Sequence, residues 1–321
     1  MTTMTETAAP SSRLEHFPIS FFAVTMGLFG LALASRAAGL SAISAVIGWA
    51  AASVFALLVA VYAIKALRHP AAMKGEWNHP VRIAFFPAVS ISLLLCATFL
   101  REGHADLAAP VWIAGAALQG VLTIAVLANW IGHRAFGPGH LSPAWFIPAV
   151  GNVVVPLAGV PLGHVEISWY FFSVGLLFWL ILLTLVFNRL VFHDPLPGKL
   201  RPTLVILIAP PAVGFLAWLQ LQGGALDATA RLLINCGYLF TLLVLTQAPA
   251  FLRQPFALSF WALSFPVAAM AIASFRFAAL AGSVVHQGIG WTLLGLLGVI
   301  VAALLLRTGL AMMRGEICQP E

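Results

Sequence analysis

The side chains that could act chemically on a substrate are few in this chain, and they stand outside its long apolar stretches. Among 321 residues there are 16 Lys and Arg, 10 Asp and Glu and 9 His. The histidines fall in loops or near predicted helix ends without a pair at metal-ligand spacing, and the sequence has no nucleotide-binding loop, nucleophile elbow or zinc motif. Cys96, Cys236 and Cys318 are far apart, which is typical of packing cysteines. We therefore expect neither an enzyme, a cofactor nor a metal site.

Arginines near the predicted helix ends are the candidate ligand contacts. A ring of arginine or lysine at the mouth of a pore concentrates anions. The alternative is that these arginines only fix the orientation of the chain or extend toward lipid headgroups. No Asp, Glu, Lys or Arg falls near the middle of an apolar stretch, which argues against a proton-coupled carrier with a membrane carboxylate. The candidates are Arg82 and Arg276, followed by Arg36, Arg101, Arg231 and Arg201.

The composition indicates that membrane-spanning helices position these residues. The chain is 61% hydrophobic and 8% charged, whereas a soluble domain carries roughly 25% charged residues. Apolar stretches of about 20 residues are long enough to cross a bilayer. The sequence therefore predicts an all-α integral membrane protein with ten transmembrane helices over 18–38, 41–67, 80–100, 107–131, 142–160, 165–189, 200–221, 226–250, 255–280 and 286–313.

The basic residues predict how these helices are oriented. With ten spans, four basic residues fall on one side, and cytoplasmic loops carry the excess of Lys and Arg. We expect a cytoplasmic N-terminal tail over 1–17, a pore domain over 18–313 and a cytoplasmic C-terminal tail over 314–321, in a bacterial inner membrane. The formal charge of +6 then reflects topology and anionic lipid rather than nucleic acid. The other side holds Arg13, Lys65, Arg68, Lys74, Arg82, Arg134, Arg189, Lys199, Arg201, Arg253, Arg307 and Arg314.

A weak internal repeat connects alternate helices. Phe85-Phe86-Pro87-Ala88-Val89 recurs as Phe146-Ile147-Pro148-Ala149-Val150, and fainter copies surround Pro210 and Pro266, at intervals of 61, 62 and 56 residues. Two spans restore the direction of the chain, so copies one hairpin apart point the same way. The sequence predicts five tandem parallel hairpins, which close most simply as a ring around an axis normal to the membrane.

Proline separates the helices into two sets. The odd-numbered helices hold every proline well inside a span, and a proline there frees a backbone carbonyl that needs a protein or water partner in lipid. We expect the odd helices to form an inner ring around a central pore, with the even helices facing lipid. The alternative is that the prolines only shape packing. They are Pro87, Pro148, Pro156, Pro210, Pro211 and Pro266.

The chain resembles the tellurite-resistance/dicarboxylate transporter family, which includes TehA-like proteins and the plant slow anion channels. The resemblance rests on His79-Pro80-Val81-Arg82, on Ser142 to Pro148 with Gly151-Asn152, and on Trp261-Ala262-Leu263-Ser264-Phe265. It implies a homotrimer with one pore in each protomer, plugged by the phenylalanine at Phe265. Family members often carry glycine and proline at the positions of Ala23 and Thr25.

These observations together favour an anion channel for small inorganic or carboxylate anions, embedded in the bilayer and closed by Phe265. A carrier that exports dicarboxylates or tellurite-type oxyanions is the alternative. A membrane enzyme or scaffold is a weaker third interpretation, because no polar catalytic cluster falls at membrane depth. Aromatics at repeat-equivalent points could complete a ring around Phe265 or merely pack in the core. The expected pore-lining residues are Phe22, Ala23, Phe86, Pro87, Phe146, Pro148, Pro210, Pro211 and Pro266.

Overall fold

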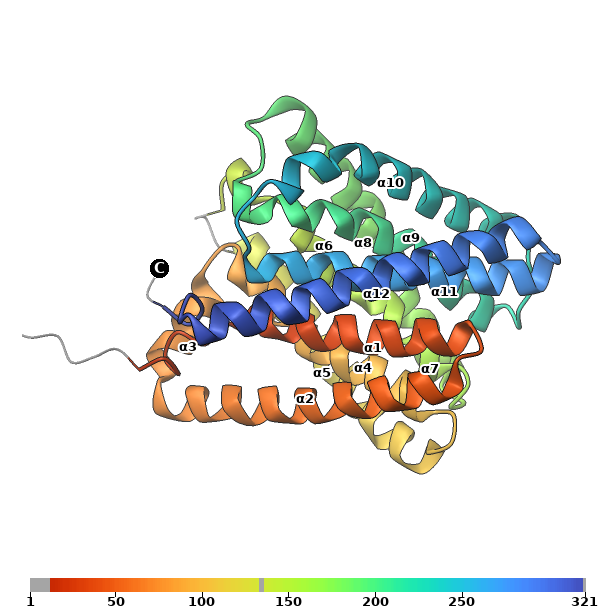
Figure 1. Cartoon of the computed structure of the whole chain (residues 1–321), viewed down its shortest axis with the longest axis horizontal. Coiled ribbons are helices and arrows are strands. Elements are labelled where there is room, and N and C mark those ends of the chain that lie inside the picture. The colour runs from red at the N-terminus through yellow and green to blue at the C-terminus, as the bar shows by residue number, and fades with distance from the viewer. Residues whose placement is uncertain (1–11, 133–135, 320–321) are drawn as a thin grey trace, which may run out of the picture.

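The chain folds into a bundle of helices. The structure, a computed structural model, describes residues 12–132 and 136–319 and contains no strand within them. Figure 1 shows long helices running beside one another, with α2 (Ser41–Arg68) and α10 (Ala228–Leu252) along opposite edges. The expected all-α architecture is confirmed for the described residues.

Five long helices form the outside of the bundle. In each of them, only 28–33% of an apolar 18-residue stretch is buried inside the protein. Large side chains such as Leu67 and Ile131 are almost fully exposed. Apolar surface of this extent is covered by hydrocarbon in a multi-span membrane protein. The outer helices correspond to the even-numbered spans of the sequence. They are α2, α5 (Ala105–Gly132), α8 (Val165–Phe192), α10 and α12 (Val284–Met313).

Four further spans form the inside and are 72–78% buried. Each of them begins as a 3-10 helix and continues as an α-helix, which the sequence reading did not anticipate. The inner pairs are η1 (Ile19–Phe21) with α1 (Phe22–Ala37), η2 (Arg82–Phe85) with α4 (Ala88–Leu100), η6 (Gly198–Ile208) with α9 (Ala209–Leu221), and η7 (Leu258–Leu263) with α11 (Ser264–Ala281).

The fifth predicted span is an interrupted helix. The stretch Pro143–Gly159 is apolar but too short and broken to count among the nine described helices that could cross a membrane by length and composition. Pro148, Gly151 and Pro156 explain the interruption, because proline and glycine disfavour a continuous α-helix. Its pieces are η4 (Pro143–Trp145), α6 (Phe146–Val150), η5 (Gly151–Val154) and α7 (Pro156–Gly159).

The inner elements contact one another around a closed circuit. α1 packs against α4 and α11, α9 packs against α11 and η5, and α4 packs against η5 and α7. Each outer helix packs on the inner element that precedes it, as α2 does on α1 and α12 on α11. Proline is not confined to the inner set, because α5 contains Pro110 and α10 contains Pro249. Both lie near a helix end, so the prediction that prolines well inside a span belong to the inner set holds for the described residues.

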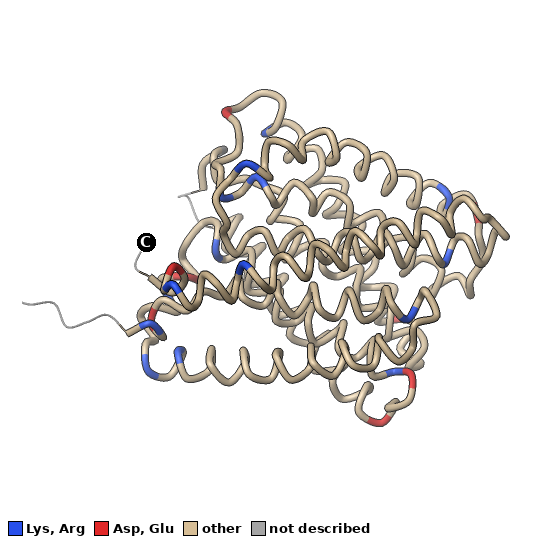
Figure 2. Tube along the Cα trace, in the orientation of Figure 1, with Lys and Arg blue, Asp and Glu red and all other residues tan. Residues whose placement is uncertain are grey.

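Charged residues gather at the two ends of the bundle, and its middle has almost none (Figure 2). The described parts of both termini lie at the same end, where the guanidinium of Arg13 lies beside Gly315 (Figure 1). Two short helices that the sequence reading did not predict, α3 (Pro70–Asn78) and η3 (Pro138–His140), connect longer ones. Arg134, one of the residues used to predict orientation, lies outside the described residues.

Glycines at close helix contacts provide a test of this packing. A Cβ at Gly175 in α8 would lie 2.6 Å from Val153 Cγ1 and 3.0 Å from the Val153 backbone nitrogen, whereas a Cβ at Gly298 in α12 would meet nothing within 4 Å. We expect Gly175→Ala to destabilise the protein by about 1–3 kcal/mol through overpacking, and Gly298→Ala to be neutral or stabilising. Thermal stability in detergent, followed by size-exclusion chromatography after heating, measures both. Equal melting temperatures for the two variants would contradict the packing of α8 on η5.

Candidate functional site: an apolar cavity

The prolines of the sequence repeat lie where the inner spans change from a 3-10 helix to an α-helix. Pro87 is the N-cap residue of α4, and Pro148, Pro210 and Pro266 lie in the first turns of α6, α9 and α11. The first N–H groups of an α-helix have no partner within the helix, so a proline there removes no α-helical hydrogen bond. The inner spans therefore change helix type at the repeat instead of kinking in the middle of an α-helix.

The interrupted span turns its polar groups toward the outer helix α5. The backbone carbonyl of Pro148 accepts hydrogen bonds from Thr123 Oγ1 at 2.9 Å and from Gln119 Nε2 at 3.2 Å. Asn152 Nδ2 donates to Thr123 Oγ1 at 3.0 Å, and Ser90 Oγ donates to Gln119 Oε1 at 2.6 Å. All four side chains are buried. This polar cluster (Ser90, Gln119, Thr123 and Asn152) satisfies a carbonyl group inside the protein without water.

A similar arrangement occurs between α1 and α4. Thr25 Oγ1 donates to the backbone carbonyl of Phe22 at 2.8 Å and forms a 2.7 Å hydrogen bond with Ser92 Oγ. Thr25 is the position at which the resembled family often has proline. Its hydroxyl binds the carbonyl one turn back in the helix, and Ser92 connects this point to α4.

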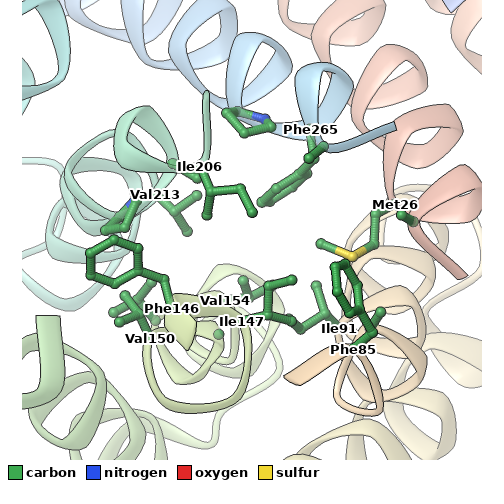
Figure 3. Close-up of a pocket in the computed structure, with 18 of the residues that line it drawn as sticks. Met26, Phe85, Ile91, Phe146, Ile147, Val150, Val154, Ile206, Val213 and Phe265 are labelled. Atoms are coloured by element: carbon green, nitrogen blue, oxygen red, sulfur yellow. The ribbon is translucent and has the colours of Figure 1, made fainter. Parts of the chain in front are cut away.

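An apolar cavity of about 70 Å³ lies between the five inner elements. Figure 3 shows side chains from each of them pointing into it. Among the described residues the lining contains no charged side chain. Its only side-chain hydrogen-bond donor there is the indole of Trp261, which donates to Thr308 Oγ1 of α12 at 3.0 Å. The lining consists of Ala23, Met26, Phe85, Ala88, Ile91, Phe146, Ile147, Val150, Gly151, Val153, Val154, Ile206, Ala209, Pro210, Val213, Trp261, Ala262, Phe265 and Pro266.

Phe265 enters this cavity from the first turn of α11. Its ring points from one side toward the residues of the opposite wall (Figure 3), and the side chain is half-buried. Gly30 of α1 faces it closely, because a Cβ at Gly30 would lie 3.6 Å from Phe265 Cδ2 and 2.9 Å from Ala268 Cβ. The absence of a side chain at Gly30 therefore lets α1 and α11 approach beside the phenylalanine.

The structure divides the expected lining residues into two groups. Ala23, Phe146, Pro210 and Pro266 line the cavity with Phe265. The remaining expected residues are outside the cavity lining: Phe22, Phe86, Pro87, Pro148 and Pro211.

Phe22 packs against the outer helix α2 instead, and Phe86 packs against the short helix α3. The ring centroid of Phe22 lies 5.9 Å from that of Phe55, and the ring centroid of Phe86 lies 4.9 Å from that of Trp77. One residue along an α-helix turns a side chain by about 100°. The neighbouring residues Ala23 and Phe85 accordingly face the cavity in their place.

None of the six expected arginines lines the cavity. Arg36 Nη1 donates to the backbone carbonyl of Phe99 at 2.9 Å, and Arg201 Nε donates to that of Leu196 at 3.4 Å. The Arg231 guanidinium lies 5.8 Å from the ring centroid of Phe277. The other three are Arg101, which pairs with Glu102 at 3.0 Å, Arg82, which is half-buried, and Arg276, which is exposed.

Sequence reasoning missed a buried ion pair near the beginning of α1. Lys65 Nζ lies 2.7 Å from Glu76 Oε2, and both side chains are at most 3% exposed. The same ammonium donates to the backbone carbonyl of Phe17 at 2.7 Å, and the carboxylate accepts from Tyr62 Oη and from the backbone N–H of Ile19. The pair thus connects the segment before α1 to α2 and α3. The only sequence signal was an acidic residue shortly after a basic helix end.

These features define a multi-span helical membrane protein whose inner elements enclose an uncharged cavity. The chain belongs to the voltage-dependent anion channel family, SLAC1, whose sequence model matches residues 16–309. This match confirms the family resemblance predicted from the sequence.

Relatives of this family align over most of the chain. An uncharacterized transporter of Methanocaldococcus jannaschii is 25% identical over 284 residues, which cover 80% of this chain and 83% of the relative. The tellurite resistance protein TehA homolog of Haemophilus influenzae is 26% identical over 261 residues, 79% of each chain. The S-type anion channel SLAH3 of Arabidopsis thaliana is 28% identical over 256 residues, which are 78% of this chain but 40% of the plant channel. Membership and relatives support anion transport as the general activity.

The buried ion pair gives a prediction about stability. Lys65→Met leaves the Glu76 carboxylate buried without its cation, and we expect a loss of about 3–5 kcal/mol. Lys65→Met combined with Glu76→Gln removes the uncompensated charge and should recover part of that loss. Thermal unfolding in detergent measures both variants. A double variant no more stable than Lys65→Met alone would show that the charge pair is not the reason for the loss.

Proposed function

We propose that this chain is an anion channel, that the apolar cavity is part of its conduction path, and that Phe265 closes this path. The observation that carries the proposal is the position of the Phe265 ring inside an uncharged cavity surrounded by all five inner elements. A hydrophobic constriction can stop ions by excluding water, and rotation of one side chain is enough to widen it.

The character of the lining determines which ions such a path would favour. An apolar wall offers no ligand that replaces the hydration shell of an ion, so the cost of dehydration sets the order of permeation. We infer that weakly hydrated anions such as nitrate pass more easily than chloride or small carboxylates. Basic residues at both ends of the bundle would raise the local anion concentration.

The proposed architecture follows the sequence reading. The interrupted stretch Pro143–Gly159, the fifth in chain order, joins the nine long helices to make ten spans. Five hairpins then point the same way around the cavity, with the outer helices in lipid. Both termini are cytoplasmic, and the membrane is a bacterial inner membrane. The contrast between the buried inner spans and the exposed outer ones supports this arrangement. The family resemblance supports a homotrimer with one path in each protomer.

Removing the Phe265 ring tests the gate. We expect Phe265→Ala to raise anion current at least about tenfold in a planar bilayer or oocyte, because it takes away the ring that points across the cavity (Figure 3). Phe86→Ala is the matched control, because Phe86 is also a half-buried phenylalanine of an inner span but packs against Trp77 outside the cavity. Negligible current through Phe265→Ala, or the same increase for both variants, would count against the gate.

The exposed arginine at the end of α11 tests the role of charge at the mouth. We expect Arg276→Gln to reduce the anion current of the Phe265→Ala variant at about 10 mM salt, because the Debye length is about 30 Å there. The reduction should disappear near 1 M salt, at which the Debye length is about 3 Å. Equal currents with and without Arg276 at low salt would show that this arginine does not attract the permeating ion.

A carrier for dicarboxylates or tellurite-type oxyanions is the second candidate, and the similarity to the tellurite resistance protein TehA homolog favours it. A carrier alternates between a form open to one side of the membrane and a form open to the other, and it would show saturable exchange with counterflow in liposomes. A channel shows flux without counterflow, so the same liposome preparation distinguishes the two mechanisms.

A further inference from the structure

The end of the bundle where α1 and α4 finish contains one carboxylate between two arginines. Glu102 Oε1 lies 3.0 Å from Arg101 Nη2, and Glu102 Oε2 lies 3.7 Å from Arg36 Nη1. Each oxygen of the carboxylate thus faces a different guanidinium. Guanidinium groups are strong partners for carboxylates, because their N–H groups donate charge-assisted hydrogen bonds to carboxylate oxygens.

Both arginines are held in place by other groups. Arg36 Nη1 donates to the backbone carbonyl of Phe99 at 2.9 Å, and its guanidinium lies 4.9 Å from the Phe99 ring centroid. Arg101 Nη1 donates to the backbone carbonyl of Leu157 in α7 at 3.4 Å. The two side chains are only 20% and 25% exposed. Their positions therefore do not depend on Glu102 alone.

Glu102 is the most exposed of the three charged residues. Its side chain is 55% exposed, and it lies in the turn between α4 and α5, beside Gly103 with a φ of 100°. An exposed ion pair contributes roughly 0–1 kcal/mol. A carboxylate on a surface turn can consequently leave the two arginines at little cost.

We propose that Arg36 and Arg101 form a binding site for a small carboxylate anion, and that Glu102 is a tethered occupant that competes with it. The site lies apart from the cavity and does not require the chain to be a channel. A ligand that binds only when Glu102 is displaced has an apparent Kd equal to its intrinsic Kd divided by the fraction of time that the site is vacant. Glu102 therefore sets how strongly this end of the protein retains carboxylates.

Replacing the tethered carboxylate by its amide tests the proposal in the detergent-solubilised full chain. Succinate is titrated against thermal stability, with sodium chloride of equal ionic strength as the reference. If Glu102 fills the site for about four-fifths of the time, Glu102→Gln should bind succinate about fivefold more tightly than the unaltered protein. Adding Arg36→Gln or Arg101→Gln to Glu102→Gln should abolish this gain.

Asp106 provides the charge-matched control. It is exposed, lies in the first turn of α5 only four residues after Glu102, and Asp106→Asn removes the same negative charge from the same end of the bundle. We expect Asp106→Asn to bind succinate as the unaltered protein does. Equal gains for the two amide variants, a gain that survives loss of either arginine, or an equal response to chloride would each overturn the proposal.

Discussion

The structure depends on one constraint: a backbone carbonyl freed where an inner helix changes type must be hydrogen-bonded inside the protein, because no water is available in hydrocarbon. Polar side chains of the same helix or of a neighbouring helix meet this requirement. Gln119 and Thr123 of α5 bind the carbonyl of Pro148, and Thr25 binds that of Phe22 with Ser92 beside it. These polar groups lie behind the inner helices, and the side chains that face the cavity are almost entirely apolar. The same constraint thus permits interrupted helices and an apolar cavity in one bundle.

Charged side chains, unlike these polar groups, lie at the ends of the bundle. Figure 2 shows Lys, Arg, Asp and Glu at the two ends of the bundle. Two ion-pair arrangements at these ends differ in burial. The Lys65–Glu76 pair is enclosed and joins the beginning of α1 to α2 and α3, so it serves the fold. The Arg36–Glu102–Arg101 group is partly open to solvent, so its carboxylate can exchange with others. In the proposed channel, the basic residues at the ends attract anions over a distance, while the apolar cavity offers no strong binding.

Much of the fold could be predicted from the sequence because hydrophobic length and proline placement act locally. Span positions agreed within a few residues, and the repeat around Pro87 and Pro148 identified the segments that form the cavity. The facing residues were harder to predict. Phe22, Ala23 and Phe86 were all expected at the cavity, but of these only Ala23 lines it, and Phe85 lines it instead of Phe86. The change from 3-10 to α-helix alters the angular register by an amount that spacing does not reveal. Gln119 and Thr123 are four residues apart in an apolar span and therefore share one face of the helix. This pair was the sequence feature that could have predicted the polar cluster.

The proposed channel function requires that ions pass through the cavity. The most direct test places a cysteine at Ile147, which lines the cavity, in a Phe265→Ala background from which Cys96, Cys236 and Cys318 have been removed. A charged methanethiosulfonate reagent should then abolish the anion current. The same reagent should leave the current unchanged when the cysteine stands at Phe86, outside the cavity lining. Persistent current after complete modification of Ile147→Cys, verified by mass spectrometry, would contradict a conduction path through this cavity.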